Sequence, residues 1–273
     1  MNIAIIGCGY VGSAVAKYWQ QKMTLIITAT TTTPERVPEL NNIAQKVFVT
    51  RANHPEAILP VIEHQDCVLI SVAGGRKTSY QATYLETAQT ISQMIDQTQV
   101  KQIIYTSTCS VYGEQNGQLV NEDTPLNPKS ENERILAQTE QILLATSNSN
   151  RQACILRLGG IYGPGRELVK IYSRVAGQTR PGEGKEPANW IHLDDIVGAI
   201  EYARHYHLSG IYNLVDDTNL TNRQVIENTC QVHNLPPVTW DSSQPSNRNY
   251  NAKVSNAKIK AAGYKFIHPV IKF

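Results

Sequence analysis

Short apolar runs alternate with longer amphipathic stretches along the first half of the chain. The apolar runs lie at residues 2–6, 24–30, 47–50, 67–72, 102–107 and 153–158, and one more follows at 211–215. They are continuously apolar rather than alternating, which is typical of strands buried on both faces of a parallel sheet. The stretches between them have helical spacing, at about 12–22, 34–41, 55–64, 78–98 and 130–146. This pattern predicts an α/β fold with a doubly wound parallel sheet.

Capping signals mark several of the predicted helix starts. Thr33-Pro34 offers an N-cap followed by proline at the first helical position. Ser130–Glu133 and Thr221–Gln224 are capping boxes. Beyond residue 163 the chain is richer in glycine, proline and cations. There we expect short helices near 168–175 and 255–262, longer ones at 191–206 and after 221, and a polar loop at 241–250.

The first strand runs into Gly7-Cys8-Gly9-Tyr10-Val11-Gly12, a G-x-G-x-x-G pattern that opens a helix. In this context Gly7 permits a tight turn, Gly9 lets the backbone approach a pyrophosphate, and Gly12 lets helix and strand pack closely. The motif therefore predicts a dinucleotide-binding Rossmann domain rather than a purely structural turn. The predicted cofactor-binding residues are Gly7, Gly9, Tyr10, Val11, Gly12, Thr31, Arg36, Ala73 and Ser107.

The end of the second strand bears on the choice of cofactor. A carboxylate there would bind the ribose 2′-hydroxyl of NAD, but this strand ends in four threonines, Thr30–Thr33, followed by Arg36. Hydroxyls and a guanidinium suit the 2′-phosphate of NADP, although the threonines would also simply suit a strand end and a cap. The sequence therefore favours NADP as cofactor, with NAD as the other choice.

Further along, Thr106-Ser107-Thr108-Cys109-Ser110-Val111-Tyr112-Gly113 follows the fifth strand, and Leu156–Gly165 and Trp190–Ile196 come later. With these segments, and with Glu122–Pro128 and Tyr212-Asn213-Leu214, the whole chain resembles the extended short-chain dehydrogenase/reductase family, which contains nucleotide-sugar epimerases and dehydratases. The resemblance implies that Thr108 supplies a hydroxyl to the reacting oxygen. Tyr112 is a second catalytic candidate, as a proton donor, with a packing role as the alternative.

The chain departs from the family at its main catalytic pair. The resemblance places a tyrosine base and a lysine four residues later on one helix face, but Asn132 and Leu136 stand at these positions. Asparagine cannot take a proton at neutral pH, so the usual proton relay is absent. The chain looks most like an atypical, YeeZ-like branch that keeps the fold and the cofactor fingerprint without this pair.

The domain layout follows from these motifs. We expect an NAD(P)-binding Rossmann domain at residues 1–163, to which 189–215 return, and a small substrate-binding lobe at 164–188 and 216–273. The predicted substrate-binding residues are Arg166, Arg180 and Trp190, with Lys185 beside them; a solvated loop is the alternative. We expect no metal site, because His205 and His207 diverge on a helix. His192 is expected to start a helix in a structural role, with Asp195 as an anchor.

The composition argues against several classes of function. The 273 residues carry 25 basic and 23 acidic side chains, so the net charge of +2 gives no sign of a nucleic-acid or membrane partner. Five scattered cysteines suggest buried thiols in a reducing cytoplasm. We expect no signal peptide, because the chain opens directly into a strand pattern. The sequence favours a cytoplasmic oxidoreductase or epimerase-like enzyme with a small-molecule substrate. The alternative is a non-catalytic sensor of NADP(H) or a metabolite. A homodimer is left open.

Overall fold

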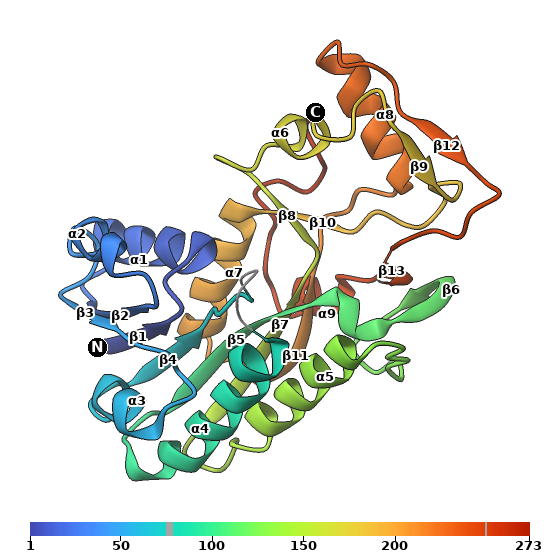
Figure 1. The fold of residues 1–273 in the computed structure, drawn as a ribbon. Coiled ribbons are helices and arrows are strands. Elements are labelled where there is room, and N and C mark those ends of the chain that lie inside the picture. The colour runs from blue at the N-terminus through green and yellow to red at the C-terminus, as the bar shows by residue number, and fades with distance from the viewer. Residues whose placement is uncertain (75–78, 249) are drawn as a thin grey trace. The chain divides into compact units, whose positions relative to one another are not determined.

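The computed structural model describes residues 1–74, 79–248 and 250–273 and divides the chain into two compact units (Figure 1). Unit 1 consists of Met1–Thr108, Ser130–Arg157 and Val197–Tyr212. Unit 2 consists of Cys109–Lys129, Leu158–Ile196 and Asn213–Phe273. The expected division into a cofactor domain and a substrate lobe is a statement about function and stays a prediction.

The largest element is a seven-stranded sheet in the order β11-β7-β5-β4-β1-β2-β3. Its strands are β1 (Asn2–Ile6), β2 (Ile26–Thr31), β3 (Lys46–Val49), β4 (Cys67–Ile70), β5 (Gln102–Thr108), β7 (Gln152–Leu158) and β11 (Gly210–Leu214). Strand β1 pairs in parallel with both β2 and β4, and β2–β3 and β4–β5 are parallel as well. The predicted doubly wound sheet is confirmed. Its order reverses between β1 and β4, where such sheets bind ligands at the carboxyl ends of their strands.

Helices cover both faces of this sheet (Figure 1). They are α1 (Tyr10–Lys22), α2 (Val37–Leu40), α3 (Pro55–Ile62), α4 (Glu86–Met94), α5 (Glu131–Leu144) and α7 (Leu193–His205), with short 3-10 or π turns at Pro34–Arg36, Gln81–Leu85 and Ile95–Gln97. Trp19 of α1 donates a hydrogen bond of 2.7 Å to Glu201 of α7. At the start of α5, Ser130 and Glu133 form the predicted capping box, each side chain accepting from the other residue's backbone N–H.

Unit 2 is built from short elements around apolar clusters of its own. Its elements are a 3-10 turn at Cys109–Tyr112, β6 (Glu114–Val120), β8 (Gly160–Tyr162), α6 (Leu168–Tyr172), β9 (Thr179–Pro181), β10 (Trp190–His192), α8 (Asn222–Val232), β12 (Thr239–Asp241), β13 (Asn251–Val254) and α9 (Ala257–Ala261). The strands pair as β8–β10, β9–β12 and β6–β13. Thr221 and Gln224 form the second predicted capping box, at the start of α8.

Two segments depart from the expected local structure. The helix expected from Ile191 starts only at Leu193, and His192 is the last residue of strand β10 rather than a helix start. The residues at 34–41 form a 3-10 turn followed by one turn of α-helix, and the Thr33 side chain makes no capping bond. The expected start of the helix at residue 78 lies outside the described residues. Within the described ranges, no helix is long and apolar enough to span a bilayer.

Candidate functional site

Three glycines shape the loop between β1 and α1, each for a different reason. Gly7 has φ 86°, and a Cβ there would lie 2.7 Å from the carbonyl oxygen of Ser71, so only glycine fits this turn. A Cβ on Gly12 would lie 2.6 Å from the Gly7 oxygen, because α1 packs directly on the turn. At Gly9, by contrast, no atom of the described residues lies within 4 Å of the Cβ position. The loop is therefore held tightly at both ends and open in its middle.

This open position adjoins the N-terminus of α1, which begins at Tyr10. The first N–H groups of a helix have no intrahelical acceptor, and the helix dipole favours negative charge there. The pyrophosphate of a dinucleotide therefore fits the loop by shape and by charge. Val11 is buried and Tyr10 is half-buried, so these two residues would contact the pyrophosphate through their backbone N–H groups.

Arg36, the last residue of the 3-10 turn after β2, reaches back onto the same loop. Its Nη1 donates to the carbonyl oxygen of Cys8 at 2.6 Å, and its Nη2 donates to Ser13 Oγ at 3.0 Å. The guanidinium also pairs at 3.3 Å with Glu39 of α2, a carboxylate that the sequence analysis missed. Thr31 is buried, and its hydroxyl accepts from the Thr33 N–H at 3.1 Å. A cation and a carboxylate thus lie together beside the glycine loop.

The two remaining cofactor candidates lie after neighbouring strands. Ala73 is exposed just beyond β4. Ser107, on β5, is buried, and its hydroxyl donates to Glu140 at 2.5 Å. Glu140 in turn forms a buried ion pair with Arg157 at 2.7 Å. The Ser107 side chain is therefore part of an internal polar network, and its role toward a cofactor stays a prediction.

The two catalytic candidates differ in their surroundings. Thr108 is the last residue of β5 and is half-buried. Tyr112 is completely buried, and its hydroxyl lies 2.9 Å from the Asn121 carbonyl oxygen and 2.8 Å from Asn213 Oδ1. Both of these partners are acceptors, so the phenol proton is engaged inside unit 2. This geometry favours the packing role of Tyr112 over proton donation.

The positions of the family's tyrosine and lysine fall on the first turns of α5. Asn132 is exposed, whereas Leu136 is only 4% exposed and belongs to the core. A lysine at position 136 would lose its hydration in this environment. The replacement at position 136 is therefore a packed apolar contact.

The predicted substrate-binding residues all lie in unit 2. Arg166 is exposed after β8, and Arg180 is half-buried on β9. Trp190 packs edge-on against Tyr162 and Tyr172, at ring centroid distances of 6.2 and 6.1 Å. Their assignment to a substrate stays a prediction.

Asp216, two residues beyond β11, is a candidate that the sequence analysis missed. Its Oδ1 accepts from the Thr218 N–H at 2.9 Å, and its buried Oδ2 has no hydrogen-bond partner among the described residues. Burial, with a smaller effect of nearby Asp217 and Asp195, raises the pKa of this carboxyl to about 7. A group that exchanges its proton near neutrality suits acid–base work. Its signal in the sequence is the Asp216-Asp217 pair directly after a strand of the parallel sheet.

Asp195 has the anchoring role expected of it. Its carboxylate accepts from the backbone N–H groups of Ile267 at 2.6 Å and His268 at 2.9 Å. His192, Asp194 and His268 form a cluster next to it, with ligand-type atoms within 4.8 Å of one another. Asp194 already bonds both rings, through its N–H to His192 and through Oδ2 to His268. We interpret the cluster as part of the anchor, and the expectation of no metal stays a prediction.

Comparisons with known proteins agree with this architecture. The model of the NAD dependent epimerase/dehydratase family matches residues 3–214. Protein YeeZ of Escherichia coli (strain K12) is 30% identical over 224 residues, which cover 78% of this chain and 77% of YeeZ. DesIV, the dTDP-glucose 4,6-dehydratase of Streptomyces venezuelae solved with NAD and TYD bound, has a TM-score of 0.80 at 17% identity, covering 100% of this chain and 93% of DesIV. A functionally unknown conserved protein from Silicibacter pomeroyi DSS has a TM-score of 0.78 at 23% identity, with 98% and 94% of the chains covered.

Proposed function

The chain belongs to the NAD dependent epimerase/dehydratase family, and from this we propose that it is a cytoplasmic NAD(P)-dependent oxidoreductase or epimerase-like enzyme. Its substrate in this proposal is a small polar molecule of the sugar-nucleotide-like class, because DesIV is a dTDP-glucose 4,6-dehydratase. The observation that carries the proposal is the glycine loop, where the open position at Gly9 adjoins the N-terminus of α1. A nicotinamide cofactor bound there supplies a hydride acceptor or donor. The five cysteines are buried and are thiols rather than disulfides, which suits a reducing compartment.

The preferred cofactor in this proposal is NADP(H). Arg36 supports it, because its guanidinium lies on the glycine loop instead of pointing into solvent, at bonding distance from Cys8 and Ser13. A 2′-phosphate would compete with Glu39 for this cation. A hydrogen bond between charged groups contributes about 1.5–3 kcal/mol, which corresponds to a roughly ten- to hundredfold preference.

Proton transfer in the proposed enzyme does not use the family's tyrosine and lysine, because Asn132 and Leu136 replace them. Thr108 is the residue proposed to bind the reacting oxygen, as the resemblance implies. Asp216 is the described carboxyl whose pKa of about 7 suits a proton donor or acceptor at neutral pH. Its unpartnered Oδ2 leaves one oxygen uncommitted to the fold.

A second candidate function is a sensor that binds NADP(H) without turnover. The specific observation in its favour is Leu136, whose buried side chain fills the position of the lysine with an apolar contact. In that case the glycine loop and Arg36 would serve ligand binding alone.

Calorimetric titration with NADPH and NADH, followed by a screen of metabolites with the nicotinamide absorbance as readout, separates the two functions. We expect the chain to bind NADPH more tightly than NADH and to oxidise or reduce at least one compound in the screen. Binding without turnover of any compound would favour the sensor. No binding of either dinucleotide would contradict both functions.

A further inference from the structure

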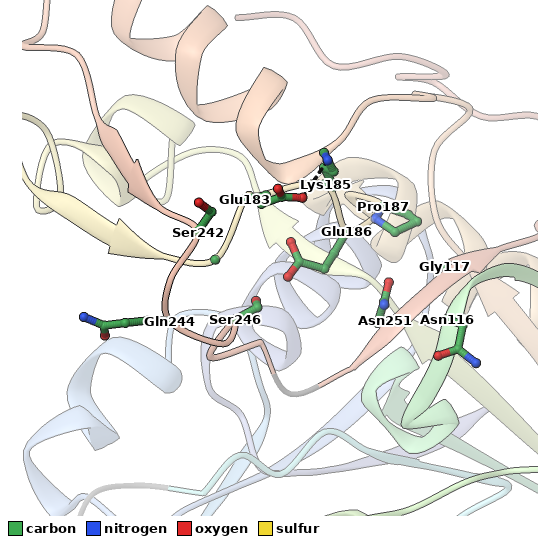
Figure 2. Close-up of a pocket in the computed structure, with 11 residues that line it drawn as sticks. Asn116, Gly117, Glu183, Lys185, Glu186, Pro187, Ser242, Gln244, Ser246 and Asn251 are labelled. Carbon is green, nitrogen blue, oxygen red and sulfur yellow. Dashed lines mark ion pairs between the residues drawn. The ribbon is translucent and has the colours of Figure 1, made fainter.

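Unit 2 contains a pocket of about 440 Å³ that the proposed function does not yet use (Figure 2). Its wall is polar: side chains of Asn116, Glu186, Ser242, Gln244, Ser246 and Asn251 line it. Its volume lies within the range of about 300–1,000 Å³ that small-molecule sites occupy. Amide and hydroxyl groups around such a space suit a ligand with several hydroxyls.

The charges in the wall are unequal. Glu183 and Lys185 neutralise each other in an ion pair of 2.6 Å, and the Lys185 ammonium lowers the pKa of Glu183. Glu186 has no such partner: its Oε2 is buried without a hydrogen bond among the described residues, as is Asn251 Oδ1. Figure 2 shows the Glu186 carboxylate in the middle of the ring of labelled residues. The pocket therefore carries one uncompensated negative charge.

Two arginines that adjoin the lining segments along the chain or through a backbone bond, Arg223 and Arg248, contact other side chains. Arg223 stacks over Trp240 at 5.3 Å and pairs with Glu227 at 3.4 Å. Arg248 lies over the ring of Tyr250 at 5.3 Å. Neither arginine is part of the pocket wall. A cationic group on a ligand can therefore supply the positive charge that the side chains around Glu186 lack.

The backbone that presents Glu186 is fixed in place. Gly182 and Gly184 have φ of 85° and 67°, and a Cβ on Gly184 would lie 2.5 Å from the Trp240 ring. A Cβ on Gly182 would lie 3.0 Å from Ser246. Both glycines are thus required for the segment before Glu186 to pack against the 240–246 segment. The backbone at Glu186 is therefore held in position before any ligand arrives, which favours binding.

We propose that this pocket binds a small polyhydroxylated ligand with a protonated amino group, an amino sugar, and that Glu186 is its counter-ion. The carboxylate accepts charge-assisted hydrogen bonds from the ammonium, while Asn116, Ser242 and Asn251 bind the ring hydroxyls. The same carboxylate disfavours a phosphate or diphosphate group inside this pocket, so a sugar-nucleotide-like substrate would place only its sugar here. The inference rests on the proposed function only in taking this ligand as the substrate or as part of it.

Ligand-observed NMR and calorimetry on the full chain, without dinucleotide, test the pocket directly. The probes are D-glucosamine at pH 6.5, where its amine is protonated, and D-glucose, its uncharged counterpart. We expect glucosamine to bind at least tenfold more tightly than glucose. Glu186→Gln should remove this preference while leaving the weak glucose binding unchanged.

Glu183→Gln combined with Lys185→Gln is the matched control, since this pair lines the same pocket but is neutral as a whole. It should change glucosamine affinity less than threefold. Equal binding of the two sugars, retention of the preference in Glu186→Gln, or no saturable glucosamine binding up to its solubility would each overturn the proposal. Titration with NADPH is run on the same samples. Loss of dinucleotide binding contradicts the proposed function, whereas loss of sugar binding alone contradicts only this inference.

Discussion

The guanidinium of Arg36 lies 2.6 Å from the carbonyl oxygen of Cys8, so the 3-10 turn that follows β2 is hydrogen-bonded to the glycine loop. The pair joins two parts of the chain that are 28 residues apart. It places a fixed positive charge next to the backbone that a dinucleotide would contact. The charge beside the glycine loop therefore depends on whether the Arg36 guanidinium pairs with Glu39 or with a bound ligand.

The first prediction concerns the contribution of Arg36 to cofactor affinity. Arg36→Ala should lower NADPH affinity about ten- to hundredfold and change NADH affinity less than threefold, because only NADPH carries the 2′-phosphate. Glu39→Gln should raise NADPH affinity, because it frees the guanidinium from its ion pair. Titration calorimetry on the wild type and both variants measures this. An equal loss of both dinucleotides in Arg36→Ala would mean that Arg36 only supports the loop.

The glycine loop gives a second prediction through two contrasting substitutions. Gly9→Val should keep the fold and lower dinucleotide affinity at least tenfold, because the side chain would occupy open space beside α1. Gly7→Ala should destabilise the protein by roughly 1–3 kcal/mol, because its φ is 86° and its Cβ would clash with Ser71. Urea unfolding and NADPH titration separate the two effects. A stable Gly9→Val variant with wild-type affinity would remove the loop from the proposed cofactor site.

A third prediction is a pH dependence of stability from Asp216. Its folded-state pKa is raised to about 7, whereas an unfolded aspartate titrates near 4. The folded state therefore binds more protons over this window, and its contribution to the free energy of unfolding is lost as the pH rises from about 4 to 7. Each pKa unit corresponds to about 1.4 kcal/mol, so the loss is roughly 2–4 kcal/mol.

Asp216→Asn should remove that dependence. Urea unfolding at pH 5 and pH 8 should show the variant gaining on the wild type at the higher pH. Asp123→Asn, a change at an exposed site, serves as the control and should follow the wild type at both pH values. A wild-type curve that is flat over this range relative to Asp216→Asn would rule out a raised pKa.

The fourth prediction concerns rate. General acid–base catalysis typically contributes about 10²–10⁴-fold, so the unmodified chain should epimerise UDP- or dTDP-sugars at least a hundredfold more slowly than an enzyme with the tyrosine and lysine. Asn132→Tyr with Leu136→Lys should retain NADPH binding and raise this activity. Leu136→Lys alone should cost about 2–4 kcal/mol of stability, because position 136 is buried. Efficient epimerisation by the wild type in a coupled assay would contradict this interpretation of the site.

How far the sequence predicts this molecule depends on the element. The buried strands such as β1 and β4 were predictable because they are continuously apolar, and α5 and α8 because their capping boxes are local. Strand β6 (Glu114–Val120) was not predictable, since it is polar and is stabilised by pairing with the distant β13. At β10, apolar Ile191 fits a helical pattern as well as it fits a strand. The residue lies in a strand because β10 pairs with β8.

The candidate site likewise has parts that the sequence predicts and parts that it does not. Gly7, Gly9 and Gly12 follow a spacing that the turn itself requires, so the loop could be predicted from the sequence. The direction of the Arg36 side chain could not be predicted, because it depends on the turn at Pro34–Arg36 that brings the guanidinium back to Cys8. The raised pKa of Asp216 comes from burial among residues distant in the chain, and no local pattern encodes it.

The five buried thiols make the native chain a poor substrate for alkylating reagents. Cys67 is fully buried, and burial raises the pKa of its thiol to about 12, so almost no thiolate is available. Cys8 is 1% exposed and sits within the glycine loop itself. Maleimide incorporation at this cysteine would therefore report opening of the loop, while modification of Cys67 requires the sheet to come apart. Mass-resolved labelling kinetics can thus distinguish local opening from global unfolding without any introduced probe.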